Sequence, residues 1–121
     1  MAIKSHKDLE AWKAAMALAR IVYSISAKWP SDERFGLISQ IRRAAVSVPS
    51  NIAEGKGRGS DAEFARFCAI AFGSLMEMET QLTLANEFGW FSIPEYETAM
   101  LEISRVGQLI NGLRRRLAKD R

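Results

Sequence analysis

The feature that most constrains this chain is a helical spacing of apolar residues that recurs along almost its whole length. Apolar residues recurring every three or four positions place one apolar stripe on a helix. This spacing runs approximately through residues 8–28, 32–54, 60–88 and 93–117. No segment shows the alternation of apolar and polar residues that is typical of a strand. The sequence therefore predicts an all-α protein. Short connections favour an up-down-up-down antiparallel four-helix bundle that forms a single domain over 1–121.

Turn and cap signals set the expected helix boundaries. Trp29-Pro30 should end the first helix, because a residue before proline is pushed out of the helical region. Ser31 or Asp32 should then cap the second helix. Glu54-Gly55 provides a stop for the second helix, which leaves a basic glycine loop before the third.

Pro49 falls inside the second apolar stripe, where it removes one backbone donor and crowds the preceding turn. The stripe continues in phase through Ile52. We therefore expect one helix that is kinked at Pro49 rather than two separate helices.

The last two helices carry stronger start signals. Ser60 with Glu63, and Ser92 with Glu95, have the spacing of capping boxes, in which each side chain satisfies the other residue's backbone N–H. Gly73 lies in the middle of the third helix, where glycine costs about 1 kcal/mol relative to alanine. A close helix–helix contact would explain why this glycine is tolerated.

Length and composition exclude several classes of protein. A chain of 121 residues suits one domain with a real core, and it has no apolar run long enough to span a membrane. The N-terminal residues lack a secretory signal, and the single Cys68 forms no intramolecular disulfide. These features are typical of a cytoplasmic protein.

No catalytic, metal or cofactor site is predicted. His6 is the only histidine, Cys68 has no identifiable activating base, and Glu77 and Glu79 point to different helix faces. The GKGRGS segment lacks the spacing and the preceding strand of a nucleotide-binding loop. An enzyme would have to recruit groups across a subunit interface, such as Glu54 beside Arg58 of a neighbour.

The charges are unevenly distributed, although the formal net charge is only +3. Basic residues cluster in two regions that could contact an acidic partner or cap helices. They are Arg42, Arg43, Lys56 and Arg58 in the first region and Arg114, Arg115 and Arg116 in the second. Residues 61–88 are instead mostly acidic, so the opposition of signs could also guide packing between subunits.

The chain has more large aromatic residues than one four-helix seam readily buries. Trp90 and Phe91 follow the third helix and are candidates for an oligomer interface. The alternative is that these side chains plug one end of the bundle.

Three segments carry a resemblance to a known family: HKDLEAW at 6–12, FGLISQIRRAAVSVPSNIAEGKGRGSDAEFARF at 35–67 and AFGSLMEMETQL at 71–82. They resemble the bacterial four helix bundle protein family, which includes proteins encoded within intervening sequences of large-subunit ribosomal RNA genes. The chain is also similar to the accessory variability determinant of diversity-generating retroelements. The most distinctive part runs from Ser39 through Arg42, Arg43, Pro49 and Asn51 to Arg58.

The resemblance implies an antiparallel four-helix bundle assembled as a ring-like homopentamer. For the retroelement relatives it implies a basic surface that engages nucleic acid. The leading interpretation is thus a non-enzymatic oligomeric protein that binds RNA or DNA through a basic face. The alternative is a scaffold that binds a protein partner and no nucleic acid.

Overall fold

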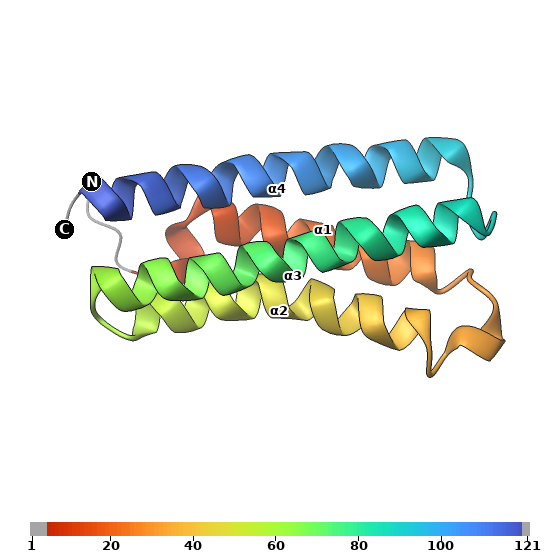
Figure 1. Cartoon of the computed structure of the whole chain (residues 1–121), viewed down its shortest axis with the longest axis horizontal. Coiled ribbons are helices and arrows are strands. Elements are labelled where there is room, and N and C mark those ends of the chain that lie inside the picture. The colour runs from red at the N-terminus through yellow and green to blue at the C-terminus, as the bar shows by residue number, and fades with distance from the viewer. Residues whose placement is uncertain (1–4, 120–121) are drawn as a thin grey trace.

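The computed structural model describes residues 5–119 and consists of four antiparallel α-helices (Figure 1). They are α1 (Glu10–Ser26), α2 (Leu37–Gly57), α3 (Asp61–Glu87) and α4 (Ile93–Lys119), with short 3-10 helices η1 (His6–Asp8) before α1 and η2 (Ser31–Glu33) before α2. The described residues contain no strand. The predicted all-α, up-down-up-down bundle is therefore confirmed.

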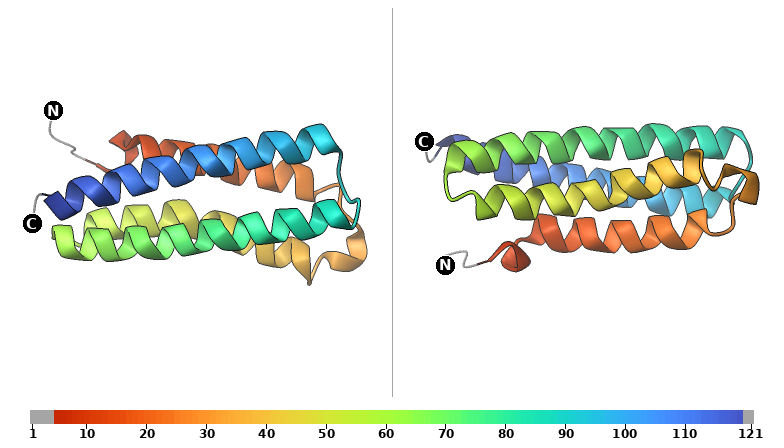
Figure 2. Two further views of the ribbon diagram at one scale, coloured as in Figure 1. Left: turned by 45° about the horizontal axis from the view of Figure 1, so that its top comes forward. Right: turned by 90° about the horizontal axis from the view of Figure 1, so that it is seen from below.

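Each helix packs against two neighbours, in the order α1–α2–α3–α4 and back to α1 (Figure 2). The apolar stripes meet along the central axis, where burial of each large side chain stabilises the fold by about 1.5–3 kcal/mol. The largest fully buried side chains include Leu18, Ile41, Ile52, Leu75, Met78, Leu82, Ile103 and Ile110. Within residues 5–119, no helix is long and apolar enough to cross a membrane.

The α2 helix begins later than the predicted 32–54, and α1 is shorter than the predicted 8–28. Ser31 belongs to the η2 turn, and α2 starts only after Gly36. The carboxylate of Glu33 accepts a hydrogen bond from the backbone N–H of Leu37 at 3.1 Å. Glu33 therefore satisfies a donor of the first turn, the role that the sequence assigned to Ser31 or Asp32.

Pro49 lies inside α2 as a buried residue, and the helix continues through it without a break. The expectation of one helix rather than two is confirmed. The bend at Pro49 remains a prediction.

The α2 helix also ends later than predicted, because Gly55 is a packing residue and not a stop. A Cβ atom at Gly55 would lie 2.7 Å from the Cβ of Phe67 on α3, which is closer than such atoms approach. The chain turns instead at Gly59, whose φ of +85° favours glycine. The predicted glycine loop is thus mostly helix, and the α2–α3 connection is short.

The expected close contact at Gly73 is absent, because no atom lies within 4 Å of a Cβ built there and the residue is exposed. Its neighbour Ser74 faces α2 instead and is buried. The side-chain hydroxyls of Ser74 and Ser47 are 2.9 Å apart. The small residue that allows close packing here is therefore Ser74.

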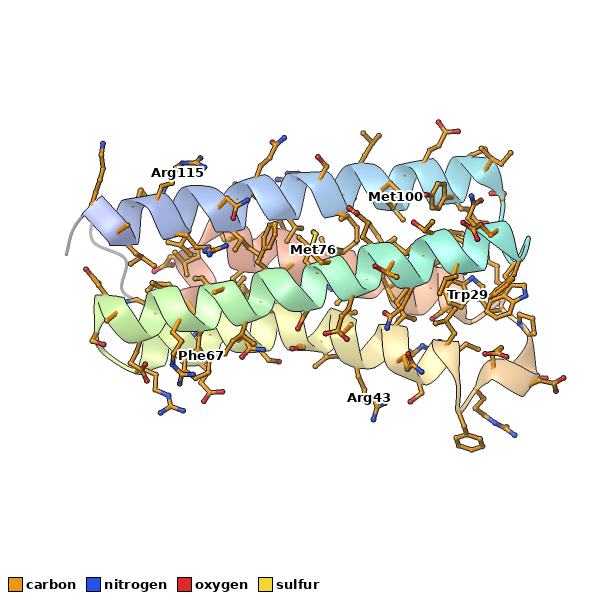
Figure 3. The ribbon with its side chains drawn as sticks, in the orientation of Figure 1. Trp29, Arg43, Phe67, Met76, Met100 and Arg115 are labelled. Carbon is orange, nitrogen blue, oxygen red and sulfur yellow. The ribbon has the colours of Figure 1, made fainter. Side chains whose placement is uncertain are left out.

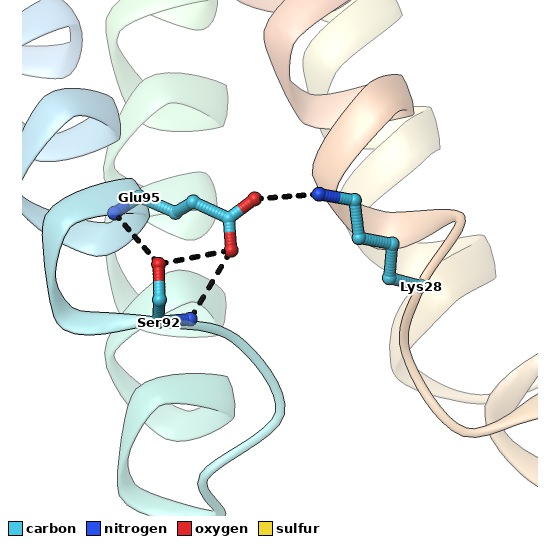
Figure 4. A network of polar contacts seen from close by, with 3 residues as sticks. All are labelled: Lys28, Ser92 and Glu95. Atoms are coloured by element: carbon cyan, nitrogen blue, oxygen red, sulfur yellow. Dashed lines mark hydrogen bonds and ion pairs between the residues drawn. The ribbon is translucent and has the colours of Figure 1, made fainter.

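One capping box forms completely and the other only in part. The Ser92 hydroxyl accepts from the backbone N–H of Glu95, and the Glu95 carboxylate accepts from the backbone N–H of Ser92, both at 3.2 Å (Figure 4). The other Glu95 oxygen accepts from the Lys28 ammonium at 2.9 Å, which ties α4 to the end of α1. At α3, Ser60 accepts from the backbone N–H of Glu63, but the Glu63 carboxylate pairs with Arg66 instead.

Candidate nucleic-acid interface

The topology brings part of the predicted basic set to one end of the bundle. The last turns of α2 and α4 and the first turn of α3 all lie at this end (Figure 1). It carries Lys56 and Arg58 from α2 and Arg114, Arg115, Arg116 and Lys119 from α4. We call these six residues the basic end. Cations in the last turn of α4 also complement the negative end of its helix dipole.

Two arginines of the basic end are held by their own chain. Arg58 donates to the Glu54 carboxylate at 2.6 Å and lies 5.0 Å from the centre of the Phe67 ring. Arg114 is half-buried, donates to the side-chain oxygen of Asn111 at 3.3 Å and lies over Phe72. These contacts orient the guanidinium groups against α3 while Arg58 stays exposed.

Within residues 5–119, the other cations of the basic end have no carboxylate partner. Lys56, Arg115 and Arg116 make no ion pair with any carboxylate of residues 5–119. Arg115 and Arg116 are exposed, and Arg115 extends from α4 near its C-terminal end (Figure 3). Their charges are therefore available to a ligand.

Acidic side chains offset part of the positive charge at the basic end. Glu63 and Arg66 form an ion pair at 2.9 Å on the first turns of α3. The hydrogen bond from Arg66 holds the pKa of the Glu63 carboxyl below its ordinary value, so that this group stays ionised. Both side chains are solvent-exposed, so the pair contributes little to stability.

Arg42 and Arg43 lie apart from the basic end, near the N-terminal part of α2. The Arg42 guanidinium donates to the Ser26 hydroxyl at 2.9 Å and to the Tyr23 carbonyl at 3.2 Å, and it stacks 4.6 Å from the Tyr23 ring centre. Arg42 therefore supplies hydrogen-bond donors to acceptors at the C-terminal end of α1. Arg43 is exposed and points away from the bundle (Figure 3).

The predicted interface residues Trp90 and Phe91 are half-buried and pack within their own chain. Their ring centres lie 5.7 and 5.5 Å from that of buried Trp29. Phe88 and Tyr96 extend the cluster. This geometry supports the alternative in which Trp90 and Phe91 plug one end of the bundle.

The reactive residue types are not assembled into a site. Burial raises the pKa of the Cys68 thiol to about 11, so Cys68 is protonated at neutral pH. Residues 5–119 hold no group of three potential metal ligands. Glu54 pairs with Arg58 of its own chain.

Several large apolar residues are exposed, of which Ile93 and Leu101 were not identified from the sequence. Phe35 is 86% exposed because it precedes the start of α2. Ile93 and Leu101 of α4 are 67% and 71% exposed. Both lie off the buried stripe of α4, which includes Ala99 and Ile103, and this spacing was the sequence signal that could have identified them.

Comparison with known proteins identifies the family of this chain. Residues 7–112 match the family model described as 23S rRNA-intervening sequence protein. The chain belongs to this family. The match covers all but the two ends of the chain, and the predicted relationship to intervening-sequence proteins is confirmed.

A solved structure shows the same fold. It is the crystal structure of a protein of unknown function from the S23 ribosomal protein family of Bacteroides thetaiotaomicron VPI-5482. It superposes with a TM-score of 0.78 at 23% sequence identity, over 87% of this chain and 95% of that one. No curated protein sequence matches this chain.

Proposed function

We propose that this intervening-sequence family member is a non-enzymatic, oligomeric cytoplasmic protein that binds nucleic acid through its basic end. The observation that carries the proposal is the set of exposed cations at that end that form no ion pair within residues 5–119, Arg115 and Arg116 above all. Exposed arginine and lysine side chains bind phosphates and release condensed counterions, which drives association. The family's description refers to ribosomal RNA, which is consistent with such a ligand.

The test compares two double variants with the same change in net charge. Arg115→Gln with Arg116→Gln should weaken binding to a single-stranded RNA about equally for all sequences and reduce its salt dependence, by about one unit of slope per lost phosphate contact. Lys28→Gln with Arg34→Gln, at exposed positions near the other end of the bundle (Figure 1), is the control. Fluorescence anisotropy measures both. Equal loss in the two variants would remove the basic end from the proposal.

Assembly is the second part of the proposal, and it rests on two complementary surfaces. An apolar groove of about 460 Å³ lies between α1 and α2 and is lined by Trp12, Met16, Ala19, Arg20, Tyr23, Val46, Pro49, Ser50 and Ala53. On α4, exposed Ile93, Glu97 and Leu101 follow one another at one-turn spacing. We propose that this stripe of a second copy occupies the groove, with Glu97 near Arg20.

Because the two surfaces differ, the contact is heterologous, and such contacts form a ring when the rotation between subunits closes, as in the homopentamer that the resemblance implies. Leu101→Glu should dissociate the oligomer, measured by light scattering on a sizing column, while the helical circular dichroism spectrum is retained. Gln108→Glu, which places the same charge at an exposed α4 position farther along, should leave it assembled. Dissociation by both variants, or by neither, would contradict this interface.

The competing function is a protein-interaction scaffold with no nucleic-acid ligand. Exposed Tyr23, Phe35 and Val46 favour it, because they line one groove together and contiguous exposed apolar side chains mark protein contacts. A stable oligomer that does not bind RNA or DNA at low salt would support the scaffold.

A further inference from the structure

A polar groove of about 400 Å³ lies between α2 and α3, on a surface that the proposed function has not used. It is lined by Gln40, Arg43, Ala44, Ser47, Ser74, Glu77 and Gln81. Its lining differs from that of the apolar groove between α1 and α2, because most of its side chains end in a hydrogen-bonding group. Such a lining suits a polar ligand.

The floor of the groove is held in place by hydrogen bonds. The hydroxyls of Ser47 and Ser74 are 2.9 Å apart, which joins α2 to α3. The Asn51 amide donates to the carbonyl of Ser47 at 2.8 Å and to its hydroxyl at 2.9 Å. These groups are therefore ordered before any ligand arrives.

Gln81 has an unsatisfied hydrogen-bond acceptor in this groove. The residue is only 7% exposed, and its side-chain oxygen is buried with no hydrogen-bond partner among the described residues. A buried polar atom without a partner is unusual and costs about 1–3 kcal/mol. An N–H or O–H donor of a ligand would satisfy this oxygen, for which the described residues supply none.

Charged groups on both sides of the groove are also unpaired. Glu77 precedes Gln81 by one helical turn on α3, so that their side chains lie on the same face. Arg43 lies on the α2 side, and neither charged residue forms an ion pair with any partner in residues 5–119. The groove therefore offers two neighbouring acceptors on one side and a guanidinium donor on the other.

We infer that this groove binds an unpaired guanine base of single-stranded nucleic acid; the inference rests on the proposed function. Guanine carries two adjacent donors, N1–H and the exocyclic amino group, on its Watson–Crick edge, where Gln81 and Glu77 would accept. Its O6 and N7 acceptors suit the Arg43 guanidinium. Adenine, cytosine and uracil lack two adjacent ring and amino donors. Unstacked bases read on these edges are the usual basis of sequence-specific RNA recognition.

The experiment compares binding of the full chain to an oligouridine strand and to the same strand with one central guanine or one central adenine, at a single salt concentration. We expect the guanine strand to bind about tenfold more tightly than the adenine strand, as for one bidentate contact. Gln81→Met, which keeps the side-chain length without the amide, and Glu77→Gln should each abolish the preference. Glu87→Gln, an exposed carboxylate on the same helix, should retain it.

The ratio between the guanine and adenine strands is the readout, because removing a carboxylate also strengthens phosphate binding in general. Equal, salt-dependent binding of both strands would overturn the guanine site and leave the proposed function standing. Absence of binding to every strand would overturn both. A guanine preference that survives Gln81→Met would assign the base to another surface and overturn the site in this groove.

Discussion

At the scale of single residues, Gly55 determines how closely α2 approaches α3. An added Cβ would lie 2.7 Å from the Phe67 Cβ, so Gly55→Ala should overpack this contact and lower the free energy of unfolding by about 1–3 kcal/mol. Gly57→Ala is the control, because nothing lies within 4 Å of its added Cβ and alanine favours the helix by up to about 1 kcal/mol. Urea unfolding measures both. Equal stabilities would contradict the assigned role of Gly55.

Arg42 illustrates a residue whose sequence context suggests a ligand contact and whose geometry indicates a structural one. Its two hydrogen bonds reach Ser26 and the Tyr23 carbonyl. Arg42→Gln should therefore reduce the free energy of unfolding by about 1–3 kcal/mol. Arg43→Gln, at an exposed position beside it, should change stability little. The prediction is wrong if thermal melts show the two variants to be equally stable.

At the scale of elements, the Lys28–Ser92–Glu95 network fixes the start of α4 against the end of α1. Hydrogen bonding from Lys28, and then from Ser92, lowers the pKa of the Glu95 carboxyl. A carboxyl with a lowered folded-state pKa stabilises the protein above its unfolded-state pKa, and this contribution disappears as the pH falls through the folded-state pKa.

Glu95→Gln should therefore be less stable than the natural protein at neutral pH, and this difference should shrink as the pH falls below the ordinary carboxyl pKa. Glu87→Gln, at an exposed position without an ion pair among the described residues, should show no such dependence. Urea unfolding across acidic pH values measures the difference. A constant deficit at all pH values would contradict the network.

The periodic stripes made the four helices predictable, but several boundaries depend on contacts between helices. Gly55 has the local features of a stop, yet it is needed where Phe67 approaches. Glu63 has capping-box spacing, yet Arg66 one turn later competes for its carboxylate. The spacing of residues along one helix does not predict where a residue of another helix will lie. It also does not predict which of two local partners a side chain will bind.

At the scale of the whole molecule, the antiparallel order decides which basic residues act together. It brings the ends of α2 and α4 to one end of the bundle and leaves Arg42 beside the end of α1. Arg43 also lies away from the basic end (Figure 3). The sequence predicted the charged residues but not this division, because it depends on which helix ends coincide. The packing of Trp90 and Phe91 likewise depends on Trp29, which the fold places beside them.

The most direct test of the account is the binding of the purified protein to mixed RNA and DNA, at low and moderate salt, on a sizing column with light scattering. If the basic end binds nucleic acid, we expect a complex that contains the oligomer and weakens steeply as salt increases. An oligomer that elutes without nucleic acid even at low salt would contradict it, and the cations of the basic end would then be solvated helix ends.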